Sequence, residues 1–237
     1  MTGEFAGKVV VVTGAAGNLG SAVVRAAAAE GARVVLVERS PDKAEKLAAE
    51  IGGETLTVLA DLGVAASVDQ LIETVVARFG QIDVLAHTVG GFESGATVHG
   101  SDYDAMERML NLNLRPVYIT CGKVAQHMID KGIAGRIVVV LARGGLKGFA
   151  GGSAYTASKA AAQRVVESLA AEVRDKGIHV NAIMPSTIDT PPNRASMPNA
   201  DFSKWVTPEE AAQAILFLAS ERGSAFYGTS LEVYGRA

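Results

Sequence analysis

The stretch that most constrains the fold is residues 9–20, an apolar run that ends in a glycine-rich turn, VVVVTGAAGNLG. Four consecutive valines without polar alternation are typical of a strand buried on both faces of a parallel sheet. The turn opens into a helical pattern over residues 21–30. Glycines let backbone N–H groups approach a pyrophosphate at a helix N-terminus, whose dipole favours negative charge. The stretch therefore predicts a strand, a phosphate-binding turn and a helix.

The second apolar run, residues 33–37, ends in an acidic residue, Glu38, 18 positions after Gly20. A carboxylate at this place accepts hydrogen bonds from the ribose hydroxyls of NAD and repels the 2′-phosphate of NADP. Arg39 follows directly and would instead tolerate that phosphate. NAD(H) is therefore the expected cofactor, and NADP(H) is the alternative.

Strand and helix patterns alternate along all 237 residues. This alternation predicts one Rossmann-type α/β domain over residues 1–237, with a doubly wound, parallel, seven-stranded sheet between two layers of helices. One long helix, residues 103–131, is expected to break near Pro116. Residues 185–206 form a long polar segment after the carboxyl end of a strand, where ligands of open α/β sheets bind. The segment is therefore expected to be a substrate loop or lid.

Composition argues against several partners. Basic and acidic residues number 22 and 25, and no basic cluster stands out, so neither nucleic acid nor a membrane is expected as a partner. No signal-peptide pattern or bilayer-length apolar run is present, and the single cysteine, Cys121, cannot form an internal disulfide. These features favour the cytoplasm. The four histidines lack metal-ligand spacing, so no metal is expected.

Tyr155 and Lys159 are four residues apart, which places them on the same face of a predicted helix over residues 153–176. A tyrosine with a pKa of about 10 is a poor acid–base catalyst at neutral pH. A nearby ammonium stabilises the phenolate and is expected to lower that pKa. Next to a dinucleotide turn, the pair predicts proton transfer beside a hydride-transfer site.

Together these features resemble the short-chain dehydrogenase/reductase family, over essentially the whole chain. The resemblance rests on Thr13, Gly14, Gly20, Asp61, Gly90, Asn113, Tyr155, Lys159, Pro185 and Thr190. It implies an oxidoreductase in which Tyr155 is the acid–base. Lys159 would also hold the nicotinamide ribose, and Asn113 would support a water-linked proton relay to Lys159. A homo-oligomer, dimer or tetramer, is implied in the same way.

The family resemblance also implies a cofactor-binding set. Its members are Gly14, Gly17, Asn18, Leu19, Gly20, Glu38, Arg39, Asp61, Leu62, His87, Gly90, Tyr155, Lys159, Pro185, Ile188 and Thr190. Asn18 replaces the family's middle glycine, and asparagine tolerates the left-handed conformation better than most residues. His87 is expected to be a structural hydrogen-bonding group near the adenosine.

The main departure from the family is Ala142, 13 residues before Tyr155, where a substrate-orienting serine is usual. Losing such a hydroxyl typically costs about 10²- to 10³-fold in rate. A conjugated ring such as a quinonoid pterin delocalises the incoming electrons and needs no second donor. Residues 188–205 and 89–92 also resemble dihydropteridine reductases, a variant of the family. The leading hypothesis is therefore a pterin-like substrate contacting Phe92, Ala142, Phe149, Met197 and Trp205.

Two alternatives remain. In the first, the enzyme acts on an ordinary ketone or alcohol, of the 3-oxoacyl type or similar, and Ser153, Thr88 or a water replaces the missing serine. In the second, the chain is an NAD-binding regulator with little turnover. The joint presence of Tyr155, Lys159 and Asn113 argues against the regulator, because a non-catalytic protein has no physical need for a tuned phenol.

Overall fold

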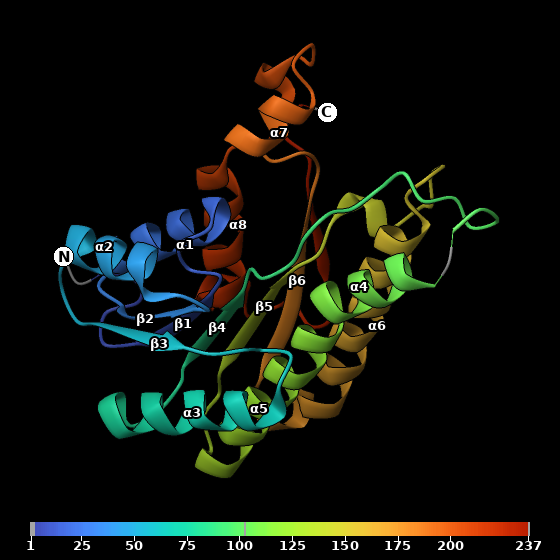
Figure 1. Cartoon of the computed structure of the whole chain (residues 1–237). Helices are drawn as coiled ribbons and strands as arrows, with labels where there is room; N and C mark the ends of the chain where they lie inside the picture. Colours follow the sequence, from blue (N-terminus) through green and yellow to red (C-terminus); the bar gives the residue numbers. More distant parts are fainter. Residues whose placement is uncertain (1–2, 102, 237) are drawn as a thin grey trace.

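The computed structural model of the protein describes residues 3–101 and 103–236. Seven parallel strands form one sheet in the order β3-β2-β1-β4-β5-β6-β7, with helices on both faces (Figure 1). The strands are β1 (Val9–Thr13), β2 (Arg33–Glu38), β3 (Thr55–Leu59), β4 (Val84–His87), β5 (Arg136–Val140), β6 (His179–Pro185) and β7 (Ser230–Val233). The predicted fold class is confirmed.

Two hydrophobic cores lie on the two faces of the sheet. One is covered by α1 (Asn18–Ala29), α2 (Pro41–Ile51) and α8 (Pro208–Ala219), and the other by α3 (Ala65–Phe79), α4 (Asp104–Asn113), α5 (Arg115–Lys131) and α6 (Ser153–Val173) (Figure 1). Alternate valines of β1 pack into opposite cores: Val10 and Val12 into the first, Val9 and Val11 into the second. Burial on both sides explains why this strand has no polar alternation.

The break predicted near Pro116 in the helix over residues 103–131 is confirmed. Two helices, α4 and α5, meet at Leu114, and Pro116 lies in the first turn of α5. The segment 185–206 is not irregular throughout. It contains α7 (Pro191–Ser196) and the 3₁₀ turn η3 (Phe202–Lys204). The Thr190 hydroxyl caps α7 by accepting a hydrogen bond from the Asn193 N–H.

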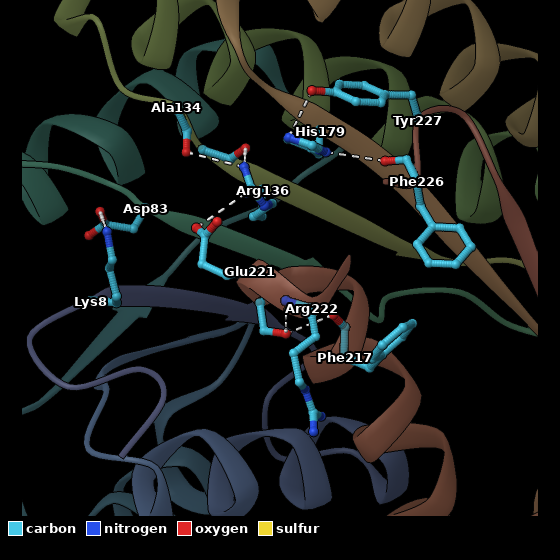
Figure 2. Close-up of polar contacts among 12 residues, drawn as sticks. Lys8, Asp83, Ala134, Arg136, His179, Phe217, Glu221, Arg222, Phe226 and Tyr227 are labelled. Atoms are coloured by element: carbon cyan, nitrogen blue, oxygen red, sulfur yellow. Dashed lines mark hydrogen bonds and ion pairs between the residues drawn. The ribbon is translucent and has the colours of Figure 1, made fainter. Parts of the chain in front are cut away.

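Polar contacts hold the amino-terminal edge of the sheet (Figure 2). The buried Asp83 carboxylate accepts hydrogen bonds from the Val9 N–H at 2.9 Å and from the Lys8 ammonium at 3.3 Å. At the start of β6, a ring nitrogen of His179 is 2.9 Å from the Tyr227 hydroxyl. Ligands of open α/β sheets bind at the opposite, carboxyl-terminal edge.

The thiol of Cys121 lies in the core beneath α5, and burial raises its pKa to about 12. A thiol in this state is inert, in agreement with its interpretation as a small apolar residue. No helix in the part of the chain that the structure describes combines the length and apolarity needed to cross a membrane.

Candidate active site

Tyr155 and Lys159 lie one turn apart near the beginning of α6, as their spacing predicts. The Lys159 side chain is buried, and its ammonium donates a hydrogen bond to the Val140 carbonyl at 3.1 Å. Burial raises the pKa of the Tyr155 phenol to about 12 and lowers the pKa of Lys159 to about 8. The expectation that the ammonium lowers the pKa of the phenol is therefore wrong for this structure, because the cost of burying a phenolate dominates.

Asn113 joins three elements around this pair. Its side-chain oxygen accepts from the Gly91 N–H at 2.8 Å, and its side-chain nitrogen donates to the Gly91 carbonyl and to the Ser158 hydroxyl, both at 3.0 Å. At Gly90 an added Cβ would lie 2.9 Å from the Lys159 ammonium and 3.0 Å from the Asn113 oxygen. A side chain there would have to displace the Lys159 ammonium and the Asn113 amide, so glycine allows the loop after β4 to pack directly on the predicted catalytic residues.

Ser158 belongs to this network although sequence reasoning did not single it out. Its hydroxyl donates to the Tyr155 carbonyl at 2.7 Å while it accepts from Asn113. A serine inside an alanine-rich helix carries no signal of its own. Its proximity to Asn113, 45 residues away in the chain, could have been inferred only from the packing of α4 against α6.

The glycine-rich turn has the shape required for a pyrophosphate. Gly14 adopts a positive φ of 63°, and a Cβ at Gly20 would collide with the Gly14 carbonyl. Gly17 caps α1 from its backbone alone, and no side chain accepts a hydrogen bond from the first turn. The first N–H groups of α1, including that of Leu19, are therefore available to an anion. The turn thus fits a dinucleotide.

Asn18 does not need the left-handed conformation that was invoked for it. It is the first residue of α1, and none of the non-glycine residues that the structure describes has a positive φ. Asparagine is accommodated here as an ordinary helical residue because the special backbone angle of the turn falls on Gly14.

Glu38 ends β2 and is tied to the turn, because its carboxylate accepts a hydrogen bond from the Ala16 N–H at 2.6 Å. The adjacent Arg39 is exposed.

The residues that follow β3 are the next predicted cofactor contacts. Asp61 is exposed, and its carboxylate accepts a hydrogen bond from the Gly63 N–H at 2.9 Å. The side chain of Leu62 is buried in the core, so only its backbone is open to a ligand.

His87 is fully buried at the end of β4 and lies beneath the site. One ring nitrogen is 3.3 Å from the Thr13 hydroxyl, whereas the other has no hydrogen-bond partner among the described residues. Burial, together with the nearby positive charge of Lys159, lowers the pKa of His87 to about 3. The residue is therefore neutral at physiological pH, consistent with a structural hydrogen-bonding role.

On the open side of Tyr155, the exposed ring of Phe92 makes an edge-to-face contact with the phenol, with ring centroids 4.8 Å apart. The turn after Ala142 also lies close to this ring, because a Cβ at Gly144 would lie 3.0 Å from the Tyr155 ring.

Two side chains were expected as possible replacements for the missing serine, Thr88 and Ser153. The Thr88 hydroxyl already donates a hydrogen bond to the Thr13 carbonyl at 2.6 Å. Ser153 lies two helical positions from Tyr155, about 200° around the axis.

Of the remaining predicted contacts, Phe149 lies in the loop before α6, and the others lie in or next to the lid, which stands over the carboxyl end of β6 beside the C-terminus (Figure 1). Pro185, Ile188 and Thr190 follow one another along the rim at that end of β6. Met197 and Phe149 are exposed. Trp205 lines a separate cavity of about 560 Å³ together with Asp189, Arg194, Phe202, Ser203, Thr207, Glu210, Gly235 and Arg236. Neither Tyr155 nor Phe92 lines that cavity.

The arrangement is suited to proton transfer beside a bound dinucleotide. The turn at Gly14 and the N-terminus of α1 fit the pyrophosphate, and Glu38 lies where a ribose is expected. Within the described residues no group of three or more histidine, cysteine or carboxylate side chains is placed to hold a metal ion. Fold and site together fit the class of oxidoreductases that work with a nicotinamide cofactor.

Comparison with known proteins agrees with this class. The profile of the short chain dehydrogenase family matches residues 8–201. The chain is 36% identical to cis-4-hydroxycyclohexanecarboxylate dehydrogenase of Sinomonas cyclohexanicum, over 98% of this chain and 96% of the relative. It is 31% identical to 3beta-hydroxysteroid dehydrogenase 1 of Eggerthella lenta, over 99% and 95%. The solved structure of levodione reductase superposes with a TM-score of 0.90 at 28% identity, over 98% and 97%. The chain belongs to the short-chain dehydrogenase family.

Proposed function

We propose that the protein is an NAD(H)-preferring oxidoreductase that interconverts a secondary alcohol and a ketone on a small, ring-bearing substrate. The observation that carries the proposal is the packing of Gly90, Asn113 and Lys159 around the helix turn that presents Tyr155. The names of two relatives support this substrate class. One is a dehydrogenase of a hydroxycyclohexanecarboxylate and the other of a 3beta-hydroxysteroid, so each named substrate has a hydroxyl on a ring. Phe92 would provide an apolar edge for such a ring.

In this mechanism the Tyr155 hydroxyl donates a proton to the developing alkoxide during reduction and accepts it back during oxidation. The bound nicotinamide supplies or takes up the hydride. Lys159 would hold the nicotinamide ribose, and Asn113 would keep the loop at Gly91 against α6 so that this geometry persists. Because burial holds the Tyr155 pKa near 12, the phenol stays protonated at neutral pH, which suits the reductive direction.

A pterin-like substrate is the second candidate, and it rests on Ala142 and on the resemblance of residues 188–205 to dihydropteridine reductases. The relatives favour ordinary alcohols and ketones instead. If the substrate is an ordinary ketone, a water would take the place of the missing serine hydroxyl. Thr88 already donates a hydrogen bond to Thr13, and Ser153 lies on another side of α6.

Introducing a serine at position 142 tests whether a hydroxyl there assists the reduction of an ordinary ketone. The Ala142→Ser variant is expected to increase kcat for a cyclic ketone by about 10-fold or more, because a second donor would then stabilise the alkoxide. Initial rates of NADH oxidation measure the effect, and Ala150→Ser, an exposed position of the same loop, is the matched control. An unchanged ketone rate would indicate that a hydroxyl at position 142 does not stabilise the developing alkoxide, and would contradict the role expected for this position.

The cofactor preference is tested at Glu38. The Glu38→Ala variant is expected to bind NADH about 10-fold more weakly and to discriminate less against NADPH, because the carboxylate that would accept the ribose hydroxyls is removed. Fluorescence titration of both cofactors measures this, and Glu45→Ala, an exposed carboxylate on α2, is the control. Equal affinity of the wild-type protein for NADH and NADPH would contradict the preference.

A further inference from the structure

Arg143 directly follows Ala142 and begins the 3₁₀ turn η1 (Arg143–Gly145) at the carboxyl edge of the sheet. The turn is closed by a hydrogen bond from the Gly145 N–H to the Ala142 carbonyl at 2.9 Å. It is pressed against α6, since a Cβ at Gly145 would lie 3.3 Å from the backbone of Lys159. The base of the Arg143 side chain is therefore fixed beside the predicted catalytic helix.

The guanidinium of Arg143 lies over an aromatic ring near the C-terminal end of the chain. Its central carbon lies 4.7 Å from the centroid of the Tyr234 ring. Tyr234 is itself anchored, because its carbonyl accepts a hydrogen bond from the Ser186 hydroxyl at 2.9 Å, just beyond the end of β6. An aromatic ring against one side of a guanidinium orients it and leaves its N–H edges free for an anion. Arg143 itself is exposed.

Among the described residues, no ion pair neutralises the positive charge of Arg143. Arginines elsewhere around the site are paired, Arg194 with Asp189 and Arg108 with Glu93. Arg143 makes no such pair with any residue that the structure describes, and Glu232 interacts with the Tyr234 hydroxyl instead. The loop over residues 142–152 contains Arg143 and Lys147 and no acidic residue, in a chain whose net charge is −3.

We propose that Arg143 is an anion-recognition residue for the substrate, and that the preferred substrate carries a carboxylate in addition to its ring hydroxyl or ketone. This inference rests on the proposed function. The free N–H edges of the guanidinium match a carboxylate in two parallel hydrogen bonds. A carboxylate bound in this way would orient the substrate ring against Phe92. It would thereby assist in positioning the substrate, a task for which Ala142 has no hydroxyl.

The test compares two probes that differ in charge, 4-hydroxycyclohexanecarboxylate and the corresponding carboxamide, both offered with NAD⁺. The wild-type protein is expected to show a KM about 10- to 100-fold lower for the carboxylate. Arg143→Gln is expected to raise the KM of the carboxylate by a similar factor while the carboxamide kinetics stay unchanged, and Arg143→Lys is expected to recover part of the difference.

A matched control is available at the opposite edge of the sheet. Arg174 also lies over a tyrosine, Tyr227, at 5.1 Å and also forms no ion pair within the described ranges, so Arg174→Gln is expected to leave both probes unaffected. Equal KM values for the two probes in the wild-type protein would overturn the inference at Arg143 and leave the proposed function standing. Equal losses for both probes in Arg143→Gln would also overturn it, because they would indicate a structural role.

Binding without turnover provides an independent measurement. Isothermal titration of the protein with cyclohexanecarboxylate in the presence of NADH is expected to show saturable binding that Arg143→Gln weakens at least 10-fold and cyclohexanecarboxamide does not reproduce. Absence of binding, or binding that Arg143→Gln leaves intact, would refute the anion site. Binding to Arg143 together with no oxidation of either hydroxylated probe would contradict the proposed function while supporting the anion site.

Discussion

The Tyr155→Phe variant is expected to lose about 10³-fold in kcat while it binds NADH as tightly as the wild-type protein. Only the phenolic oxygen is removed, and with it the proton transfer at the reacting oxygen. The phenyl ring retains the edge-to-face contact with Phe92 and the packing against Gly144, so the site keeps its shape. Initial-rate kinetics combined with NADH titration separate the two effects.

A matched control for this variant is Tyr118→Phe, which removes the same oxygen from an exposed tyrosine on α5. It is expected to have wild-type kinetics. Full turnover by Tyr155→Phe would show that the proton comes from another group and would remove the basis of the proposed mechanism.

The Lys159→Met variant is expected to lose at least about 10²-fold in kcat/KM and at the same time to become more stable at neutral pH. The activity falls because the charged group that would hold the nicotinamide ribose is removed. The stability rises because the native fold lowers the pKa of Lys159 from 10.5 to about 8, so burial of its charge opposes folding. After loss of the bond to Val140, the net gain is on the order of 2 kcal/mol, or roughly 4–8 °C in Tm.

The pH dependence of this gain has a definite sign. Below pH 8 the lysine is charged in both the folded and the unfolded chain, and the folded state bears the full cost. As the pH rises from about 8 to 10.5, the lysine loses its proton first in the folded state, so the advantage of Lys159→Met should shrink across this window. Thermal unfolding from pH 7 to 10 measures it. The exposed Lys131→Met is the control, and a constant or growing difference would contradict the buried charge.

Much of the fold could be predicted from local patterns. The valine run of β1 is fully buried and lies inside the sheet between β2 and β4, as a strand without polar alternation requires. Proline at the start of α5 marked the break between α4 and α5. The spacing of Tyr155 and Lys159 was sufficient to place them one turn apart, since neighbouring positions on a helix follow from its period alone.

What could not be predicted depends on the environment that distant segments create. The pKa of Tyr155 rises because of burial by parts of the chain that its own helix does not specify. The same holds for the Asn113–Ser158 contact, which needs α4 and α6 to be packed together. The helix within the lid was missed because its polar, proline-containing sequence is as typical of a loop, and only the cap at Thr190 indicates a helix start.

The rate of NADH oxidation by the wild-type protein, with cyclic ketones, a 3-oxoacyl thioester and quinonoid dihydropterin offered separately, distinguishes the proposed substrate class from its alternatives. The proposed mechanism predicts saturable turnover of a cyclic ketone, its loss in Tyr155→Phe, and little turnover of the pterin. Rapid reduction of the pterin with no reduction of any ketone would contradict it, and would assign Ala142 to a substrate that needs only one proton donor.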